Sequence, residues 1–250
     1  PTNSGNRMLS MVPEVSTGTV RNYAFDNLKP GTYIYESGTL PSIEVPMGLY
    51  GALVVKPAPN QAYAGTTFDA EQLLIFSEVD AVQNAAVDAA ANIAGYPKTV
   101  NFNPKYFLIN GTAFDRSSPA ASTFSAGTPP DSATQWTVLL RLVNAGSQAH
   151  TALPVALQMT LLAEDGNLYP DRKTQADVLL GAGKAIDVMF AAPRDANGKF
   201  DATYPVFDRM LGLSSGVQTA DSGMLAYLTV GNGSAPVPVG SGPRAVNDAF

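Results

Sequence analysis

The chain has 250 residues and a formal net charge of -6, with 45% hydrophobic and only 14% charged side chains. This composition is that of a globular protein, and the length permits one large domain or two of ordinary size. Because Lys and Arg are few, the chain lacks the basic surface that nucleic-acid binding requires. With no Cys and one His, the sequence excludes disulfides, thiolate catalysis and thiolate metal sites. No stretch reaches the roughly 20 apolar residues of a membrane-spanning helix.

Short apolar runs, each bounded by Gly, Pro, Asn or Asp, recur along the chain. Such runs and boundaries predict the strands of an all-β sandwich or barrel. The clearest expected strands span residues 32–35, 51–55, 72–76, 106–109, 137–143 and 225–230. Aromatic residues alternate with aliphatic ones in these runs and are expected in the core: Tyr33, Tyr35, Tyr50, Phe76, Tyr106 and Phe107.

One helix is expected over residues 80–93, which are Ala-rich and contain neither Gly nor Pro. Asp80 is a suitable N-cap and Gly95 follows the expected end, so the sequence signals both boundaries. Residues 117–132, rich in Ser, Ala, Thr and Pro, are expected to form a loop.

An internal repeat indicates two domains. Residues 29–55 and 199–230 each place an aromatic strand after a polar turn, then an irregular loop, adjacent Gly and Met, and a final apolar strand. Each segment has the pattern of the last two strands of a sandwich, which takes about 100 residues or more. The first sandwich has too few residues before it closes and is expected to lack its early strands, so Pro1 is not expected to be a natural domain start. The expected organisation is the C-terminal half of a first domain at 1–57, a linker at 58–66, a complete second domain at 67–231, and a linker with the start of a further module at 232–250.

The segment 29–55, KPGTYIYESGTLPSIEVPMGLYGALVV, resembles the multicopper oxidases of the cupredoxin superfamily at positions 30–33, 35 and 48–51. Four later segments resemble the middle cupredoxin domain of these enzymes: PKYFLING (104–111), LLRLVNAG (139–146), LLAEDGN (161–167) and LLGAGKAIDVMF (179–190). The resemblance covers about residues 23–230. It implies an all-β fold of cupredoxin-like Greek-key β-sandwiches, one partial and one complete, with one short helix.

The resemblance also implies copper chemistry, but the residues for it are missing. A blue copper site requires a Cys thiolate and two His, and the trinuclear cluster of the family is built from His-x-His pairs. The positions that match such a pair here are Glu36 and Gly38, and the chain resembles bacterial multicopper-oxidase-like proteins that carry Glu-Ser-Gly or His-Ser-Gly in this loop. We therefore expect no catalytic residue and no copper on this chain. If it belongs to an enzyme, the resemblance implies a copper-dependent oxidase whose ligands lie elsewhere.

Other residues leave alternatives open. His150 is interpreted either as a lone metal or proton-transfer group or, as we prefer, as a polar residue at a strand edge or loop, because an imidazole needs partners to do chemistry. Four carboxylates of the closing loops are interpreted as a cation cluster or, preferably, as solvated or salt-bridged charge: Glu36, Glu44, Asp208 and Asp221.

The residues Asp195, Asn197 and Asp201 resemble half of a calcium loop, with oxygens at alternate positions and a Gly turn. No closing bidentate Glu follows at the required spacing, so a turn is preferred and calcium stays open.

The favoured hypothesis is a non-catalytic structural or interaction module of a larger extracellular or cell-surface bacterial protein, with a periplasmic location as an alternative. A protein partner or a missing segment is expected to complete the first domain, and a homo-oligomer or filament is an alternative. The end PRAVNDAF (243–250) resembles the start of a bacterial Ig-like or cadherin-like repeat. The competing hypotheses are a fragment of a multicopper oxidase and a calcium-stabilised adhesion or filament subunit.

Overall fold

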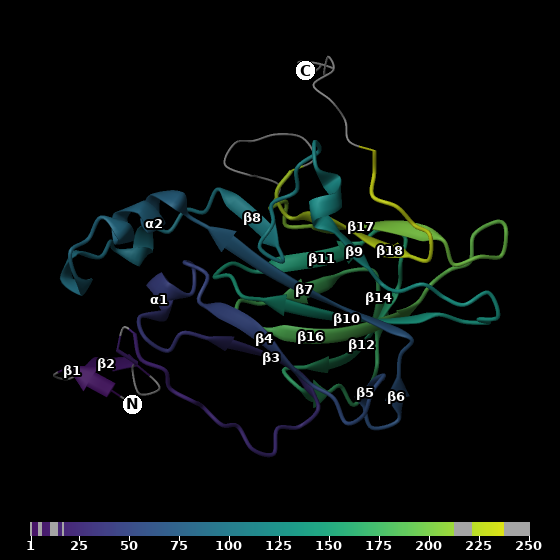
Figure 1. Ribbon diagram of the computed structural model, residues 1–250, viewed down its shortest axis with the longest axis horizontal. Coiled ribbons are helices and arrows are strands. Elements are labelled where there is room, and N and C mark those ends of the chain that lie inside the picture. Colours follow the sequence, from purple (N-terminus) through teal and green to yellow (C-terminus); the bar gives the residue numbers. More distant parts are fainter. Residues whose placement is uncertain (1, 5–6, 11–14, 17, 213–221, 238–250) are drawn as a thin grey trace, which may run out of the picture.

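The computed structural model describes residues 2–4, 7–10, 15–16, 18–212 and 222–237. Two β-sheets lie face to face around the main core, and a separate two-stranded hairpin lies against the outer face of one of them (Figure 1). This is the all-β sandwich architecture that the sequence predicts, and all six expected strands are present. No helix in the described part of the chain is both long and apolar enough to span a bilayer.

The larger sheet has seven strands. In spatial order they are β13 (Asn167–Leu168), β12 (Met159–Glu164), β16 (Ala185–Ala191), β10 (Thr137–Asn144), β7 (Ala70–Val79) and β8 (Tyr106–Ile109), with β14 (Thr174–Gln175) also paired to β12. Strands β10 and β7 run parallel, whereas the other neighbours are antiparallel. A parallel neighbour requires a crossover connection, and here the chain makes it through the second sheet.

The smaller sheet has five strands. Their spatial order is β15 (Val178–Leu180), β11 (His150–Pro154), β17 (Ala202–Asp208), β18 (Leu225–Val230) and β9 (Thr123–Ser125). Strand β9 and the preceding 3-10 turn η3 (Pro119–Ser122) fall within residues 117–132, so the expectation of a continuous loop there is wrong. The polar composition of β9 does not predict a strand. Its backbone hydrogen bonds come from parallel pairing with β18.

Strand β10 shows why the larger sheet is buried on both faces. Val138, Leu140 and Leu142 point into the core between the sheets, while Leu139 packs on the opposite face with Tyr63 and neighbouring residues. The sequence of a strand that is covered on both faces is a nearly continuous apolar run, without the alternation of apolar and polar residues found in a half-exposed strand. The outer face of this sheet is therefore a second buried layer, and it is where the charged side chain of Arg141 is found.

The outer hairpin pairs β3 (Gly31–Glu36) with β4 (Tyr50–Val55) in antiparallel register, joined through the short helix α1 (Pro41–Glu44). Strands β17 and β18 also pair antiparallel. Both copies of the sequence repeat therefore form the same kind of strand pair, although one pair stands alone and the other lies inside a five-stranded sheet.

The segment expected as a linker contains structure of its own. Strands β5 (Gln61–Tyr63) and β6 (Thr66–Thr67) form a small hairpin, in which Ala62 and Tyr63 are buried against the larger sheet. Residues 58–66 are thus not a free tether, because an aromatic side chain in this segment gains apolar contacts by folding back. A further short pair, β1 (Thr2–Ser4) with β2 (Arg7–Ser10), lies near the N-terminus. The domain boundaries stay a prediction, and residues 243–250 lie outside the described residues.

The expected helix forms but is shorter than residues 80–93. Helix α2 spans Ala81–Asp88, and the side chain of Asp80 caps it by accepting hydrogen bonds from Val82 N (2.9 Å) and Gln83 N (3.1 Å). Asn92 caps a new 3-10 turn, η1 (Ile93–Gly95), so the backbone cannot continue the helix through it. Another turn, η2 (Thr99–Asn101), leads into β8.

Candidate functional site

The sole imidazole of the chain lies in the core between two carboxylates. His150 begins β11, and its Nε2 lies 2.6 Å from Glu78 Oε1 of β7 while its Nδ1 lies 3.0 Å from Asp208 Oδ2 of β17. All three side chains are 1% exposed. Glu78 belongs to the larger sheet and the other two residues to the smaller one, so this charged triad joins the two sheets of the sandwich.

Backbone N–H groups satisfy the remaining oxygen positions of the triad. Glu78 accepts hydrogen bonds from the N–H groups of Ser147 (3.0 Å) and Gln148 (3.1 Å). The Asp208 carboxylate accepts three more, from the N–H groups of Thr151, Met210 and Gly212. Full satisfaction of this kind is what allows charges to persist in a protein interior.

The triad favours a protonated ring. Burial disfavours the charged form, but hydrogen bonds and the negative charges of Asp208 and Glu78 outweigh it and raise the pKa of His150 to about 9. The pKa of Asp208 is lowered in spite of burial, because His150, Thr151 and Met210 all donate to its carboxylate. An imidazolium ring donates from both nitrogens and has no lone pair for a metal.

The expectation that His150 is a polar residue at a strand edge or loop is therefore wrong. Strand β11 has neighbours on both sides, β15 and β17, and the rings of Phe76 and Phe107 lie against His150 at centroid distances of 6.4 Å and 6.3 Å. No sequence pattern singles out Glu78, and Asp208, expected in a closing loop, is the last residue of β17. The composition shows one His among 21 Asp and Glu residues, but it does not indicate which carboxylates lie near the ring in the folded chain.

A second buried charge cluster attaches the hairpin and the β5–β6 segment to the larger sheet. Arg141 is 1% exposed, and its guanidinium donates to Asp187 (3.2 Å), its direct cross-strand neighbour on β16. It also donates to Glu71 (3.0 Å) and to Thr32 Oγ1 of β3 (2.9 Å). Thr32 in turn donates to Asp187 Oδ1 at 2.5 Å, and the hydroxyl of Tyr63 donates to the same carboxylate.

This second cluster is structural in character. Burial raises the pKa of Asp187, and the charge and hydrogen bonds of Arg141, Thr32 and Tyr63 oppose that rise. Burial also raises the pKa of Tyr63, and the Asp187 carboxylate adds to the effect. Arg141 Nε and Nη1, Thr32 Oγ1 and the Tyr63 hydroxyl all bond to side chains of other elements, so the cluster orders the interface between the hairpin and the sandwich, although Arg141 Nη2 is buried without a partner.

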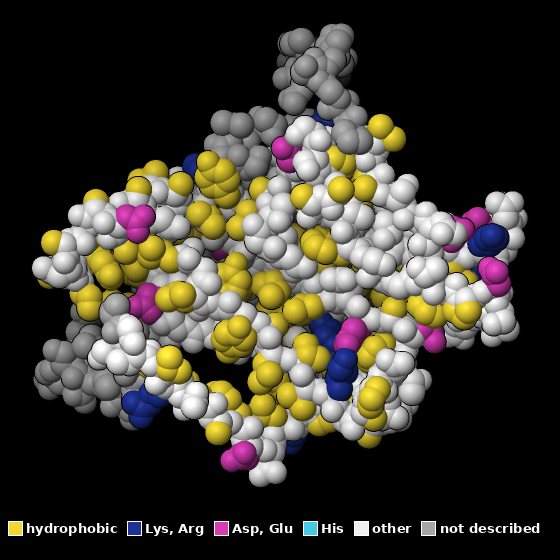
Figure 2. All heavy atoms as spheres, viewed as in Figure 1, with side chains coloured by type: hydrophobic (Ala, Val, Ile, Leu, Met, Phe, Trp, Pro, Cys, Tyr) yellow, Lys and Arg dark blue, Asp and Glu magenta, His cyan; other side chains and the backbone are white. Residues whose placement is uncertain are grey.

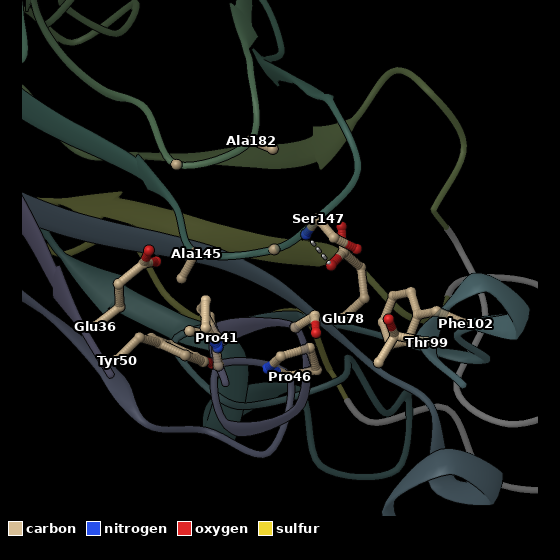
Figure 3. A pocket seen from close by; sticks show the side chains of 14 residues that line it. Glu36, Pro41, Pro46, Tyr50, Glu78, Thr99, Phe102, Ala145, Ser147 and Ala182 are labelled. Carbon is tan, nitrogen blue, oxygen red and sulfur yellow. Dashed lines mark hydrogen bonds between the residues drawn. The ribbon is translucent and has the colours of Figure 1, made fainter. Parts of the chain in front are cut away.

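The positions that match a copper-ligand pair of the multicopper oxidases lie at the end of β3 and in the bend after it. Glu36 ends β3 and is exposed, and Gly38 lies in the bend that follows. The Glu36 side chain lines a cavity of about 380 Å³ between the hairpin and the sandwich (Figure 3). A Gly supplies no ligand atom, so this pair of positions does not fit copper.

The other closing-loop carboxylates do not gather into a cation site. Glu44 accepts a hydrogen bond from Ser37 Oγ, Asp208 belongs to the charged triad, and Asp221 lies outside the described residues. Among the residues that the structure describes, no group of three or more His, Cys, Asp or Glu side chains is arranged so that it could hold a metal ion.

The half calcium loop forms a tight turn. Asp195 Oδ1 accepts hydrogen bonds from the N–H groups of Asn197 (2.9 Å) and Lys199 (2.8 Å), with Gly198 at a positive φ of 76°. The Asp201 carboxylate instead accepts hydrogen bonds from Asn232, whose backbone N–H (2.8 Å) and side-chain amide (3.2 Å) both donate to it. The two carboxylates thus have separate partners in the protein, which agrees with the preferred interpretation of a turn.

The outer face of the hairpin is apolar and uncovered. Tyr35 is 60% exposed, so the expectation that it lies in the core is wrong, and Leu49 and Leu53 are 56% and 38% exposed. Hydrophobic side chains lie at the surface over this part of the molecule (Figure 2). Among the described residues no strand pairs with either edge of β3–β4. Tyr35 has no layer to bury it, although its ring covers the cross-strand Gly51.

Comparisons with known proteins agree with this architecture. No family model matches the chain. A laccase (Laccase-7) of Oryza sativa subsp. japonica is 26% identical over 156 residues, which are 62% of this chain and 26% of that protein.

Solved structures match over more of the chain. The blue copper oxidase from Nitrosomonas europaea matches with a TM-score of 0.61 and 19% identity, over 82% of this chain and 57% of its own. The copper nitrite reductase from Nitrosomonas europaea matches with a TM-score of 0.59 and 21% identity, over 82% of this chain and 63% of the reductase chain. The laccase from Botrytis aclada matches with a TM-score of 0.54 and 20% identity, over 87% of this chain and 38% of the laccase chain. This chain spans less than two thirds of each of these relatives, and it has the cupredoxin-like β-sandwich fold of the multicopper oxidases.

Proposed function

We propose that this chain is a non-catalytic, cupredoxin-like structural or interaction module of a larger extracellular or cell-surface bacterial protein, from which the copper sites of the fold have been lost. The observation that carries the proposal is the state of His150. It is the only His of a chain without Cys, and both of its ring nitrogens bond to buried carboxylates. A blue copper site needs a thiolate and two imidazoles, so the chain cannot assemble one.

A copper-binding measurement tests this proposal. The purified chain is incubated with copper, dialysed, and analysed for bound metal and for the visible absorption of a copper–thiolate bond. We expect no stoichiometric copper and no such absorption. Stoichiometric copper together with oxidation of a phenol would overturn the proposal.

The competing function is a fragment of a copper oxidase whose ligands lie outside this chain. It is favoured by the copper enzymes among the structural relatives, of which this chain spans less than two thirds. The same metal analysis on a longer protein containing this chain separates the two functions. Copper in that protein, with none in this chain, would favour the oxidase.

The interaction role is supported by the hairpin. By the alternation of antiparallel pairs, the backbone groups of residues 32, 34 and 36 on one edge and of 50, 52 and 54 on the other point away from the pair. The residues of β4, Tyr-Gly-Ala-Leu-Val-Val, include no charge or Pro, which are devices that protect open edges. A further polypeptide segment or partner chain that adds strands here would complete the first sandwich.

Association of the chain tests that role. We expect concentration-dependent self-association, or binding of a supplied strand, that Tyr35→Lys weakens by placing a charge on the apolar face. Leu179→Lys is the matched control, because Leu179 is also exposed (62%) but lies on β15 of the other sheet. Analytical ultracentrifugation measures the effect. A stable monomer with no additional strand on β3–β4 would contradict the role.

A further inference from the structure

The cavity beside Glu36 has walls from segments that are far apart in the sequence. It lies between the connecting loop of the β3–β4 hairpin and the sandwich, and its volume is about 380 Å³. Glu36 and Tyr50 lie at one end of it, and Thr99 and Phe102 at the other (Figure 3). A volume in the range of about 300–1,000 Å³ is typical of small-molecule sites.

Most of the wall is apolar. Pro41, Val45 and Pro46 come from the α1 segment, and Phe102 and Ala145 come from the sandwich. These side chains can cover the hydrocarbon part of a ligand, which is the usual source of affinity in such a cavity.

The charged side chains that line the cavity are all acidic. Its lining residues include Glu36 and Glu78 but no Lys, Arg or His. The Glu78 oxygens already accept bonds from His150 and from two backbone N–H groups. The Glu36 carboxylate has no hydrogen-bond or ion-pair partner within the described part of the chain. Glu36 is therefore the group at this cavity that is free to pair with a ligand.

We propose that this cavity binds a small organic cation, a protonated primary amine with a compact apolar body. The ammonium group pairs with the Glu36 carboxylate, and the apolar body lies against Phe102 and the prolines of the α1 segment. An anionic ligand is disfavoured, because no cationic side chain lines the cavity and both of its charged residues are acidic. This goes beyond the structural role proposed above and does not depend on it.

Two probes of the same shape test the charge requirement. Benzylamine carries the ammonium group, and benzyl alcohol replaces it with a neutral hydroxyl. We expect benzylamine to bind the intact chain about five to ten times more tightly, since a partly exposed charge pair contributes a modest factor. Titration by NMR measures both affinities and maps the contact, which should shift the amide signals of Gly146, Ser147 and Gly183.

Variants locate the effect. Glu36→Gln should remove the preference for benzylamine and leave benzyl alcohol unchanged, while Asp171→Asn, at an exposed carboxylate away from the cavity lining, should change neither. Ala182→Phe fills the cavity from an exposed position and should weaken both probes. Equal affinities for the two probes, an unchanged preference in Glu36→Gln, or signal shifts confined to other surfaces would each overturn the proposal.

Discussion

At the scale of single residues, the molecule depends on two buried charge clusters that serve different contacts. The triad of Glu78, His150 and Asp208 joins the two sheets, and the cluster around Arg141 joins the hairpin to the larger sheet. Removing one partner of a buried pair leaves an uncompensated charge, which commonly costs about 3–5 kcal/mol. Loss of one charged partner in either cluster should therefore strongly weaken the contact that the cluster makes.

The pH dependence of stability should reveal the triad. His150 has a pKa of about 9 in the folded state, against an ordinary value of 6.5. The folded state binds this proton more tightly than the unfolded chain. Its contribution to stability is therefore fully present below the unfolded pKa, and it is lost as the pH rises through about 9. At about 1.4 kcal/mol per pKa unit, the loss is on the order of 3 kcal/mol.

Urea unfolding across that pH window measures the loss. His150→Gln keeps a hydrogen-bond donor but cannot titrate, so the variant should be less stable near neutral pH and lack this part of the pH slope. If the variant kept the slope of the unmodified chain, the proton would belong to another group.

At the scale of elements, local side-chain caps decided where helix α2 begins and where the next 3-10 turn starts, and tertiary contacts decided where the hairpin lies. Helix α2 begins at its predicted cap, whose carboxylate also accepts a hydrogen bond from Asn103 N at 2.7 Å. The hairpin is placed by Thr32, whose side chain is 1% exposed and bonds to two charged groups.

Replacing the helix cap should destabilise the protein moderately. Asp80→Ala removes the acceptor for Val82 N, Gln83 N and Asn103 N, and we expect a loss of at least about 0.5–2 kcal/mol in the free energy of unfolding, the range of a lost helix cap. Asp88→Ala, at the other end of the same helix, is the control and should change stability less, because Asp88 caps no N–H group there. Chemical denaturation of the two variants compares them directly, and equal losses would argue against capping as the cause.

Loosening the hairpin should be possible without unfolding the sandwich. Thr32→Val keeps the shape of the side chain but removes its bonds to Asp187 and Arg141, at a cost of about 1–3 kcal/mol. Amide hydrogen exchange should become faster in β3 and β4 and stay slow in β10 and β16. Faster exchange throughout both sheets would mean that the hairpin and the sandwich unfold as one unit.

At the scale of the whole molecule, both faces of the larger sheet of the sandwich are buried, while the outer face of the β3–β4 hairpin is exposed. Exposed Tyr35 and Leu53 on a hairpin without further strands are the surface through which we expect the chain to associate. The carboxylates of Asp195 and Asp201, in the turn at 195–201, bond to protein N–H groups.

Removal of calcium should therefore leave the fold unchanged. We expect the melting temperature of the chain to be the same with added calcium and with a calcium chelator, since Asp195 and Asp201 already have protein partners. Differential scanning calorimetry makes the comparison. A clear decrease with chelator, reversed by calcium, would instead favour the calcium-stabilised adhesion or filament subunit.

Much of the fold could be predicted from the sequence, but little of the charged site could. Period-two runs bounded by turn residues located the main strands, because side-chain alternation is a local property. Strand β9 was missed because its hydrogen bonds come from β18, about a hundred positions away in the chain. His150 was noticed only because it is the sole His, and nothing local indicates that Glu78 and Asp208, 72 and 58 positions away, lie beside it.

The sequence by itself determined the all-β class, the repeated strand pairs and the absence of copper ligands, since the absence of Cys and the presence of a single His are facts of composition. Only the tertiary structure decided the state of that His. Burial between two strands of different sheets places two carboxylates on its ring and favours the protonated form. It likewise decided that Tyr35 is exposed, because burial of a strand face depends on a second layer that the alternation pattern cannot supply.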